Sequence, residues 1–331
     1  MDTLTEVLDN IRSSGALIDQ NLITPPWAIR QESGASITVV AMLRGEGWIC
    51  RENADPVPLG TRDLAILTGP GDTLLTSDPD GRIAATCVLA ADGTCLGETG
   101  QPLPDTRIGH GAAVDEARLD TDHVLLAGSF PTSGRIAARL LAALPPVVVV
   151  PRAQQRSRAL ELLEAELENS EPGRQAVLDR LLDLVLIGAL RDWFALPDTE
   201  APAWYGAAGD PVVGPALAAL HAEPARAWTV ESLARRAQVS RATLARRFVE
   251  VMGEPPISYL AGWRLCLAAD LLQESEDTVE SIARQVGYSS AYALSAAFIR
   301  EYGVRPSRYR VLSRQSTGSA LGEAESTNSV P

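Results

Sequence analysis

The chain has 331 residues, enough for two domains, and its 46% apolar content and mean hydropathy of +0.02 are typical of a globular protein. No apolar run approaches the roughly 20 residues of a membrane span, and the acidic N-terminus lacks the apolar core of a signal peptide. The four cysteines include no CxxC pair, which fits a reduced compartment. We therefore expect a cytoplasmic protein.

The net charge of −13 is unevenly distributed, and all 29 basic residues are arginine. From Arg226 to Leu312 there are 12 arginines against 9 acidic residues, a balance of +3 that leaves −16 for the rest of the chain. A basic C-terminal module on an acidic body is compatible with a DNA-binding protein whose body limits non-specific binding.

The N-terminal part has a β-type pattern. Residues 1–20 are predicted to contain one amphipathic helix that ends at Gly15, and short apolar runs separated by Gly- and Pro-rich turns follow. Strands are predicted at 36–43, 47–51, 63–68, 73–76, 82–90 and 123–130. Their length and spacing indicate a sandwich or a barrel. Residues 91–121 are predicted to form a polar, Gly-rich loop.

The pattern becomes helical near Pro145, with helices predicted over 152–171 and 172–197. The leucines of the second helix cover more than one of its sides. This favours packing against both the β domain and a partner subunit, although packing within one chain explains the spacing equally well. Residues 197–211 have the composition of a linker, and the tail from Ser313 is predicted to be disordered.

Residues 228–248 have the pattern of two short helices joined by a tight turn. Thr229, or alternatively Ser232, caps the first helix, and Ser240 caps the second. The expected inner positions are Leu233, Ala234, Ala237, Val239, Leu244 and Phe248. The outer face of the second helix then carries Arg241, Ala242, Thr243, Ala245, Arg246 and Arg247. A helix with small and basic residues outward is suited to the major groove of DNA.

The same pattern returns about 49 residues later, over residues 278–303. Further helices are predicted at 212–223, before the first copy, and at 257–275, between the two copies. The matching inner positions are Ile282, Ala283, Val286 and Tyr288 at an offset of 49, and Leu294 and Phe298 at an offset of 50. Ser289 matches the cap Ser240 at the offset of 49. The chain therefore carries two helix-turn-helix units in tandem, with the 257–275 helix between them. Two such units can enter successive major grooves on one face of DNA, about 34 Å apart.

These segments resemble a known family. TVESLARRAQVSRATLARRF, GEPPISYLAGWRLCLAADLL and SIARQVGYSSAYALSAAFIREYGVRPSRYR are similar to the DNA-binding domain of AraC/XylS transcriptional regulators. GWICRENADPVPLGTRDLAILTGPGDTLLTSDP and LLAALPPVVVVP resemble the cupin-type regulatory domain of a subgroup of that family. We expect an α+β chain with an N-terminal cupin-like β-barrel and an all-α C-terminal domain.

The expected domains follow in chain order. They are a cupin-like regulatory domain at 1–151, a helical region for dimerisation at 152–197, a linker at 198–209, a DNA-binding domain at 210–312 and a disordered tail at 313–331. The helix-turn-helix units are expected at 229–252 and 278–302.

The resemblance implies base-contacting positions in both units. They are Ala242, Thr243, Ala245 and Arg246 in the first unit, and Ala291, Tyr292, Ser295 and Ala296 in the second. Ser240, Arg241, Arg247, Ser289 and Ser290 complete the expected DNA-binding set. Ala291, Ala296 and Ala297 stand where the first unit has arginine. We therefore expect the first unit to supply most of the specificity, and the second to contact shape, thymine methyls or phosphates.

The cupin resemblance raises the alternative of a metal-dependent enzyme fused to a DNA-binding module. The chain has only His110, His123 and His221, without an HxH pair, and no GxSxG, HExxH or P-loop motif. We therefore expect no enzyme activity, no metal and no cofactor. A redox-responsive regulator is the other alternative, because Cys87 and Cys95 can face each other across a hairpin.

Regulation is expected through an unidentified small molecule in the barrel. The candidate lining residues are Trp27, Arg30, Trp48, Cys50 and Thr86. Aromatic and arginine side chains on strands can orient a small polar or anionic ligand, although ordinary core packing also explains the two tryptophans. The other expected partners are double-stranded operator DNA, a second copy of the chain and RNA polymerase, without a membrane.

Overall fold

The computed structural model describes residues 18–23, 25–31, 37–69, 71–85, 87–89, 95–96, 123–130, 134–142, 144–167, 171–197, 199 and 201–313. The contacts divide these residues into two units. The N-terminal unit contains the described residues from 18 to 130 and from 141 to 199. The C-terminal unit contains 134–140 and 201–313. A short stretch that lies between two strands in the sequence therefore belongs to the C-terminal unit by its contacts.

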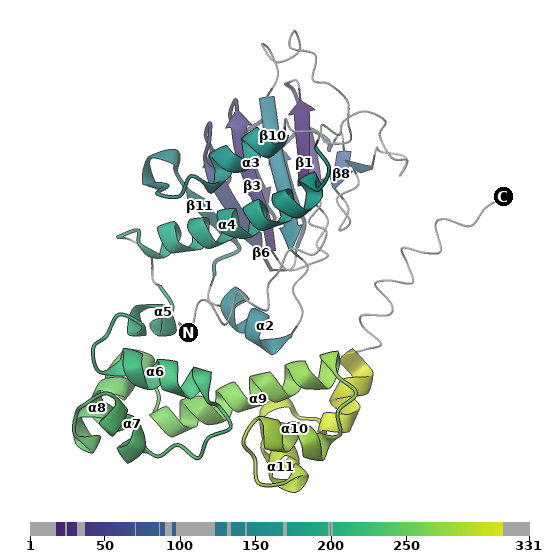
Figure 1. Ribbon diagram of the computed structural model, residues 1–331. Coiled ribbons are helices and arrows are strands. Elements are labelled where there is room, and N and C mark those ends of the chain that lie inside the picture. The colour runs from purple at the N-terminus through teal and green to yellow at the C-terminus, as the bar shows by residue number, and fades with distance from the viewer. Residues whose placement is uncertain are drawn as a thin grey trace, which may run out of the picture. The chain divides into compact units, whose positions relative to one another are not determined.

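The described strands of the N-terminal unit form two sheets (Figure 1). The first has the order β1 (Ile18–Ile23), β10 (His123–Phe130), β3 (Ile37–Arg44), β6 (Leu64–Thr68) and β11 (Val147–Val150). The second has the order β5 (Val57–Leu59), β4 (Gly47–Arg51), β7 (Thr73–Thr76), β2 (Ala28–Gln31), β8 (Cys87–Leu89) and β9 (Cys95–Leu96). One core cluster takes side chains from both sheets, including Ile29, Val40, Ile49, Leu75 and Leu125. The sheets therefore pack face to face.

Two helices cover the outer face of the first sheet. α3 (Ala159–Leu167) and α4 (Arg174–Phe194) pack on each other, and α4 contacts β6 and β11. The side chain of Leu182 on α4 fills the space over Gly128 on β10, where a Cβ would lie 2.6 Å from it. Because both of its faces are covered, β6 is buried along its whole length.

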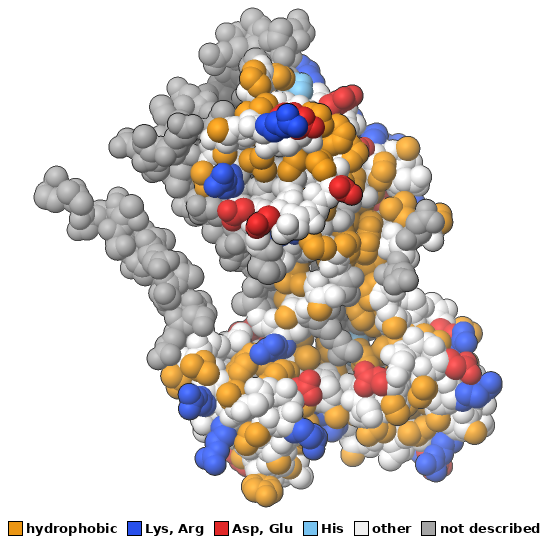
Figure 2. Space-filling model, turned by 180° about the vertical axis from the view of Figure 1, so that it is seen from behind, with side chains coloured by type: hydrophobic (Ala, Val, Ile, Leu, Met, Phe, Trp, Pro, Cys, Tyr) orange, Lys and Arg blue, Asp and Glu red, His pale blue; other side chains and the backbone are white. Residues whose placement is uncertain are grey.

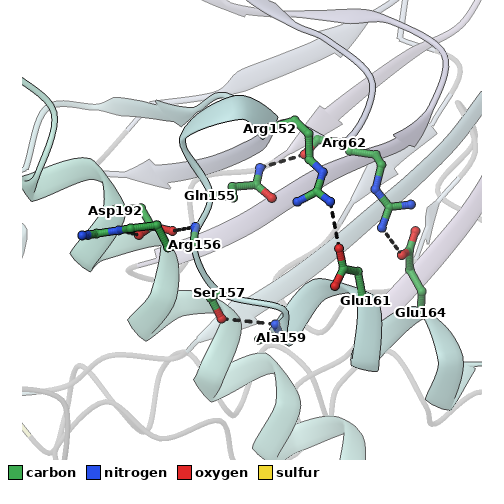
Figure 3. Close-up of polar contacts among 9 residues, drawn as sticks. All are labelled: Arg62, Arg152, Gln155, Arg156, Ser157, Ala159, Glu161, Glu164 and Asp192. Carbon is green, nitrogen blue, oxygen red and sulfur yellow. Dashed lines mark hydrogen bonds and ion pairs between the residues drawn. The ribbon is translucent and has the colours of Figure 1, made fainter.

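Ion pairs join these helices to the loop before β6 and to the segment that follows β11 (Figure 3). Arg62, in the loop before β6, pairs with Glu164 at 2.6 Å. Arg156 pairs with Asp192 of α4 at 2.8 Å, and that carboxylate is only 5% exposed. Arg152, in the short 3₁₀ helix η2 (Arg152–Gln154), pairs with Glu161 at 2.8 Å. The helical region is thus an integral part of the N-terminal unit.

The C-terminal unit is helical (Figure 1). Its elements are α2 (Arg135–Leu141), α5 (Ala203–Ala207), α6 (Val213–Ala222), α7 (Val230–Arg236), α8 (Arg241–Met252), α9 (Pro256–Glu274), α10 (Val279–Gln285) and α11 (Ala291–Tyr302). Residues 306–313 are also helical. Among the described helices, none combines the length and the apolar content needed to cross a bilayer.

The α+β class is confirmed, with a β-sheet N-terminal region and a helical C-terminal domain. Five predicted strands match β3, β4, β6, β7 and β10. The strand predicted at 82–90 is reduced to β8, and β1, β2, β5 and β11 were not predicted. The 152–171 helix begins only at Ala159. Residues 198–209, expected as a linker, include α5 with Trp204 buried. The helix expected before residue 18 and the tail after residue 313 lie outside the described residues.

Candidate nucleic-acid interface

The first helix-turn-helix unit is α7, a turn and α8. Thr229 begins α7 with its side chain accepting from the Ser232 amide, while the Ser232 hydroxyl accepts from the Thr229 amide. Ser232 is therefore the partner of the cap and not an alternative cap. Ser240 begins α8 by accepting a hydrogen bond from the Thr243 amide at 3.1 Å. These local bonds fix where both helices start.

The second unit, α10 and α11, repeats this geometry. Thr278 and Ser290 begin its helices by accepting from amides three residues further on, so the cap of α11 is Ser290 and not Ser289, the residue matched to Ser240. Each turn passes through a left-handed residue at the matching position, Gln238 at φ 55° and Gly287 at φ 88°. A Cβ on Gly287 would lie 2.7 Å from the Ala225 backbone, so this turn needs glycine for space as well as conformation. The sequence repeat is thus a repeat of backbone structure.

The predicted inner positions form the cores of both units. The fully buried ones include Leu233, Leu244, Phe248, Ile282, Leu294 and Phe298. α9 runs between the units: Tyr259 near its start contacts Phe248 edge-on, with ring centroids 6.0 Å apart, and Leu272 near its end packs in the core of the second unit. Because α9 has 19 residues, it spans about 28 Å. The two units therefore lie at opposite ends of α9.

The exposed side of α8 carries cations. Arg241, Ala242 and Arg246 are exposed, and Thr243 and Ala245 are half-buried. The Arg246 side chain is 73% exposed and 3.5 Å from Glu250, a surface pair that holds the guanidinium only weakly. The Arg246 guanidinium is therefore accessible from solvent. Figure 2 shows arginine side chains spread over the C-terminal helices.

Arg247 is held much more firmly than Arg246. Its Nε donates to Asp210 at 2.9 Å, and its Nη1 donates to Glu250 at 3.3 Å. Burial raises the pKa of Asp210, but bonds from the Val213 and Val212 amides and from Arg247 outweigh burial and lower it overall. Arg247 thus fastens α8 to the start of α6. The sequence reasoning missed this contact because its partners are 37 residues apart.

The second recognition helix, α11, presents a different face. The predicted contact residues here are Ser289, Ser290, Ala291, Tyr292 and Ser295, and none of them is buried. Tyr292 is 85% exposed, which is unusual for a large aromatic side chain. The Ala291 amide donates to the Glu280 carboxylate at 2.8 Å. A negative charge therefore lies at the N-terminus of α11, where a phosphate would otherwise be attracted.

Of the predicted effector residues that the structure describes, Trp27 alone lies in the core between the sheets. Ile29 and Ile49 belong to the core, so Arg30, Trp48 and Cys50, which alternate with such core residues, point to the opposite face. Arg30 is exposed, and burial together with Asp78 raises the pKa of the half-buried Cys50 thiol. Thr86 lies outside the described residues.

A cavity of about 690 Å³ opens at one end of the β domain. Trp48, His123, Glu46 and Asp78 contribute to its lining. Trp27 is buried in the core but reaches the cavity wall, because its Nε1 donates to His123 Nδ1 at 3.1 Å. Two of the five predicted residues are therefore associated with this cavity.

Within the described ranges no three His, Cys, Asp or Glu side chains are placed to hold a metal ion, and His110 lies outside those ranges. Cys87 is disulfide-bonded and 6% exposed, whereas Cys50 and Cys266 are free thiols.

Comparisons with known proteins agree with this geometry. The family model described as a helix-turn-helix domain matches residues 233–311, and the one described as cupin matches residues 2–195. An AraC-like transcription regulator of Streptomyces lividans is 34% identical over 315 residues, covering 94% of this chain and 98% of that protein. Another from Streptomyces antibioticus is 32% identical over 318 residues, with the same coverage. The solved DNA-binding domain of AdpA in complex with a target DNA is 33% identical, covers 33% of this chain and 96% of its own, and has a TM-score of 0.31.

Tandem helix-turn-helix units beside a cupin domain define a transcription regulator with a DNA-binding domain and a sensor domain. The chain belongs to the AraC-like transcription regulators. Its relatives are named as regulators, and nothing in the comparisons points to catalysis.

Proposed function

We propose that the protein binds operator DNA sequence-specifically, with α8 and α11 in successive major grooves on one face of the duplex. The observation that carries this proposal is the repeated unit on either side of α9, with capped helices and buried inner faces in both copies. Because its target is operator DNA, the protein acts in the cytoplasm.

Within this interface α8 supplies most of the base discrimination. Arg246 and Arg241 are the donors suited to guanine O6 and N7, and Ala242, Thr243 and Ala245 lie beside them. α11 offers the Tyr292 ring, the small Ala291 and hydroxyls at Ser289 and Ser295, which suit thymine methyls and phosphates better than bidentate base contacts.

The test is binding of the purified full chain to operators with single base-pair substitutions, measured by fluorescence anisotropy. We expect substitutions in the groove occupied by α8 to weaken binding about 5- to 150-fold, and those in the α11 groove to have smaller effects. Equal effects in both grooves would show that the division of labour is wrong. A flat response in both would show that binding is not sequence-specific.

The protein acts as a homodimer through α3 and α4. Leu162, Val177 and Leu184 are large apolar side chains on these helices and are 57%, 45% and 50% exposed. Exposed apolar groups on packed helices mark association surfaces. RNA polymerase is the partner through which bound protein changes transcription.

The cavity beside Trp48 is the proposed effector site. Its aromatic wall and the carboxylates of Glu46 and Asp78 favour a ligand with an apolar ring and a hydrogen-bond-donating or cationic group. A candidate effector should raise the unfolding midpoint of the wild-type chain but not of a Trp48→Ala variant.

Thiol oxidation is a second candidate means of control, favoured by the disulfide at Cys87. Mass spectrometry after alkylation of oxidised and reduced protein tests it. Operator affinity should change on reduction of the disulfide, and an unchanged affinity would remove this candidate.

A further inference from the structure

The carboxylate of Asp270 on α9 binds the first turn of another helix. Its Oδ1 accepts a hydrogen bond from the backbone amide of Arg135. Its Oδ2 accepts one from the backbone amide of Ile136 at 3.2 Å. The first amides of a helix have no acceptor within the helix, so Asp270 serves α2 as a cap supplied from a different element. Asp270 is only 6% exposed. Because these amides satisfy a buried charge, the contact is a specific one.

The residues at the start of α2 pack closely against Asp270 and two tyrosines. Gly134 has φ +93°, and a Cβ there would lie 2.8 Å from the Asp270 carboxylate. The Arg135 Nε donates to the Tyr309 hydroxyl at 3.0 Å, and the guanidinium lies 4.7 Å from the centre of the Tyr302 ring. Tyr302 is the last residue of α11. The start of α2 therefore contacts both α9 and the far end of the second recognition helix.

The strands before and after α2, β10 and β11, belong to the first sheet of the N-terminal unit. β10 ends at Phe130, which pairs with Ile37, and Ile37 pairs with Thr68. β11 begins at Val147, paired with Leu67. Both connections to α2 therefore leave from the same end of one sheet, and the one before it spans only residues 131–134.

The connection after α2 is fastened inside the N-terminal unit. The Thr68 amide donates to the Pro146 carbonyl at 3.0 Å. The Thr68 hydroxyl donates to the Pro145 carbonyl at 2.9 Å. Arg51 on β4 also donates to the Pro146 carbonyl, at 3.1 Å. β4 carries Trp48, which lines the cavity. A displacement of β4 or β6 would therefore act directly on the segment that leads to α2.

We propose that α2 is the element through which the sensor domain controls the DNA-binding unit, docked on Asp270 in one state and released in another. A buried carboxylate is costly to desolvate, so its net contribution to docking is small and the contact is suited to being reversible. On release, water can replace the two amides as donors to Asp270. The proposal rests on the proposed function, because it describes how DNA binding is regulated.

The test is hydrogen exchange of the full chain, with and without operator DNA, followed in peptides covering residues 134–141. Binding free energies are coupled reciprocally, so if α2 docking affects DNA binding, DNA must affect docking. We expect operator DNA to change exchange of these peptides at least about five-fold. Asp270→Asn and Gly134→Ala break the contact from its two sides and should give fast exchange with or without DNA. Glu274→Gln, one turn further along α9 and exposed, is the control: it removes a charge that repels Asp270 but leaves both amide bonds in place, so these peptides should stay at least as protected as in wild type.

The outcomes separate the two proposals. If the wild type binds DNA but exchange at 134–141 does not respond to it, or if both variants stay as protected as wild type, α2 is not the control element. If the wild type binds no DNA sequence selectively, the proposed function fails instead. Gly134→Ala changes no residue of α9 or of the helix-turn-helix units, so its effect cannot arise from misfolding of an altered α9.

Discussion

Two neighbouring arginines on α8 are held differently. The Arg246 side chain is 73% exposed, whereas Arg247 bonds Asp210 and Glu250. We expect Arg246→Ala to weaken operator binding by about 1–3 kcal/mol and to relax the preference at one base pair. Arg247→Ala should weaken binding to all sequences alike, because it loosens α8 on α6. Anisotropy titrations on an operator and its single-substitution set measure both. If substitution of Ala296 on α11 altered base preference more than Arg246→Ala, α8 would not be the main specificity element.

Asp270 predicts a pH dependence. Burial raises the pKa of Asp270 to about 6. The bonds from the Arg135 and Ile136 amides lower the pKa by less than burial raises it. Of the nearby charges, Glu274 raises the pKa and Arg135 lowers it. The native carboxyl therefore holds its proton more tightly than an unfolded one, and its contribution to stability is lost as pH rises through about 6. Asp270→Asn does not titrate, so the difference in unfolding free energy between the two chains should shift in its favour by about 1.4 kcal/mol from pH 5 to pH 7.5, whatever its sign at pH 5. Unfolding midpoints of both chains across this range measure it, and a constant difference would contradict it.

At the level of single elements, the two recognition helices differ at their N-termini. Glu280 places a carboxylate on the Ala291 amide, at the end of α11 that would face the DNA. We expect Glu280→Gln to keep an acceptor for this amide and to raise operator affinity about two- to five-fold by removing the negative charge. Glu301→Gln, near the other end of α11, removes the same charge and is the matched control. Equal effects of the two variants would show that only net charge matters.

The helices from α6 to α11 were predictable because their signals are local, whereas α2 and α5 were not predicted. Thr229, Ser240 and Thr278 lie at helix starts, and the apolar spacing of Leu244 and Phe248 marks the inner face without knowledge of distant residues. The β domain was harder. β5 is three residues long with Pro58 at its centre, and β2 has only four residues, so their periodicity is too short to recognise.

The contacts that distinguish residues of the same type were not predictable from the sequence. Asp210 with Arg247, and Asp270 with the start of α2, join positions 37 and 135 residues apart. Arg30, Trp48 and Cys50 were expected to face the interior because strand alternation was not worked out for β2 and β4. Ile29 and Ile49 face the core, so Arg30 and Cys50 cannot. In both cases the tertiary structure decides, and no local pattern carries the information.

For the whole molecule, dimerisation through α3 and α4 is directly testable. Leu184 on α4 is 50% exposed, and an aspartate there would place a charge in the proposed interface. We expect Leu184→Asp to convert the dimer to a monomer in sedimentation velocity and to lower operator affinity at least ten-fold through lost avidity. Ile257→Asp, at a 40% exposed position on α9, is the control and should stay dimeric. A dimer that survives Leu184→Asp would place the interface elsewhere.

The most direct test of the two-unit interface is genome-wide mapping of the binding sites of the wild type and of Arg246→Ala. We expect one shared motif made of two elements about 10 base pairs apart, one for each recognition helix. In the Arg246→Ala map, the element bound by α8 should lose its preference at one position, while the α11 element stays unchanged. A motif with a single element, or a wild-type motif that Arg246→Ala leaves intact, would contradict the assignment of α8 as the main determinant of sequence specificity.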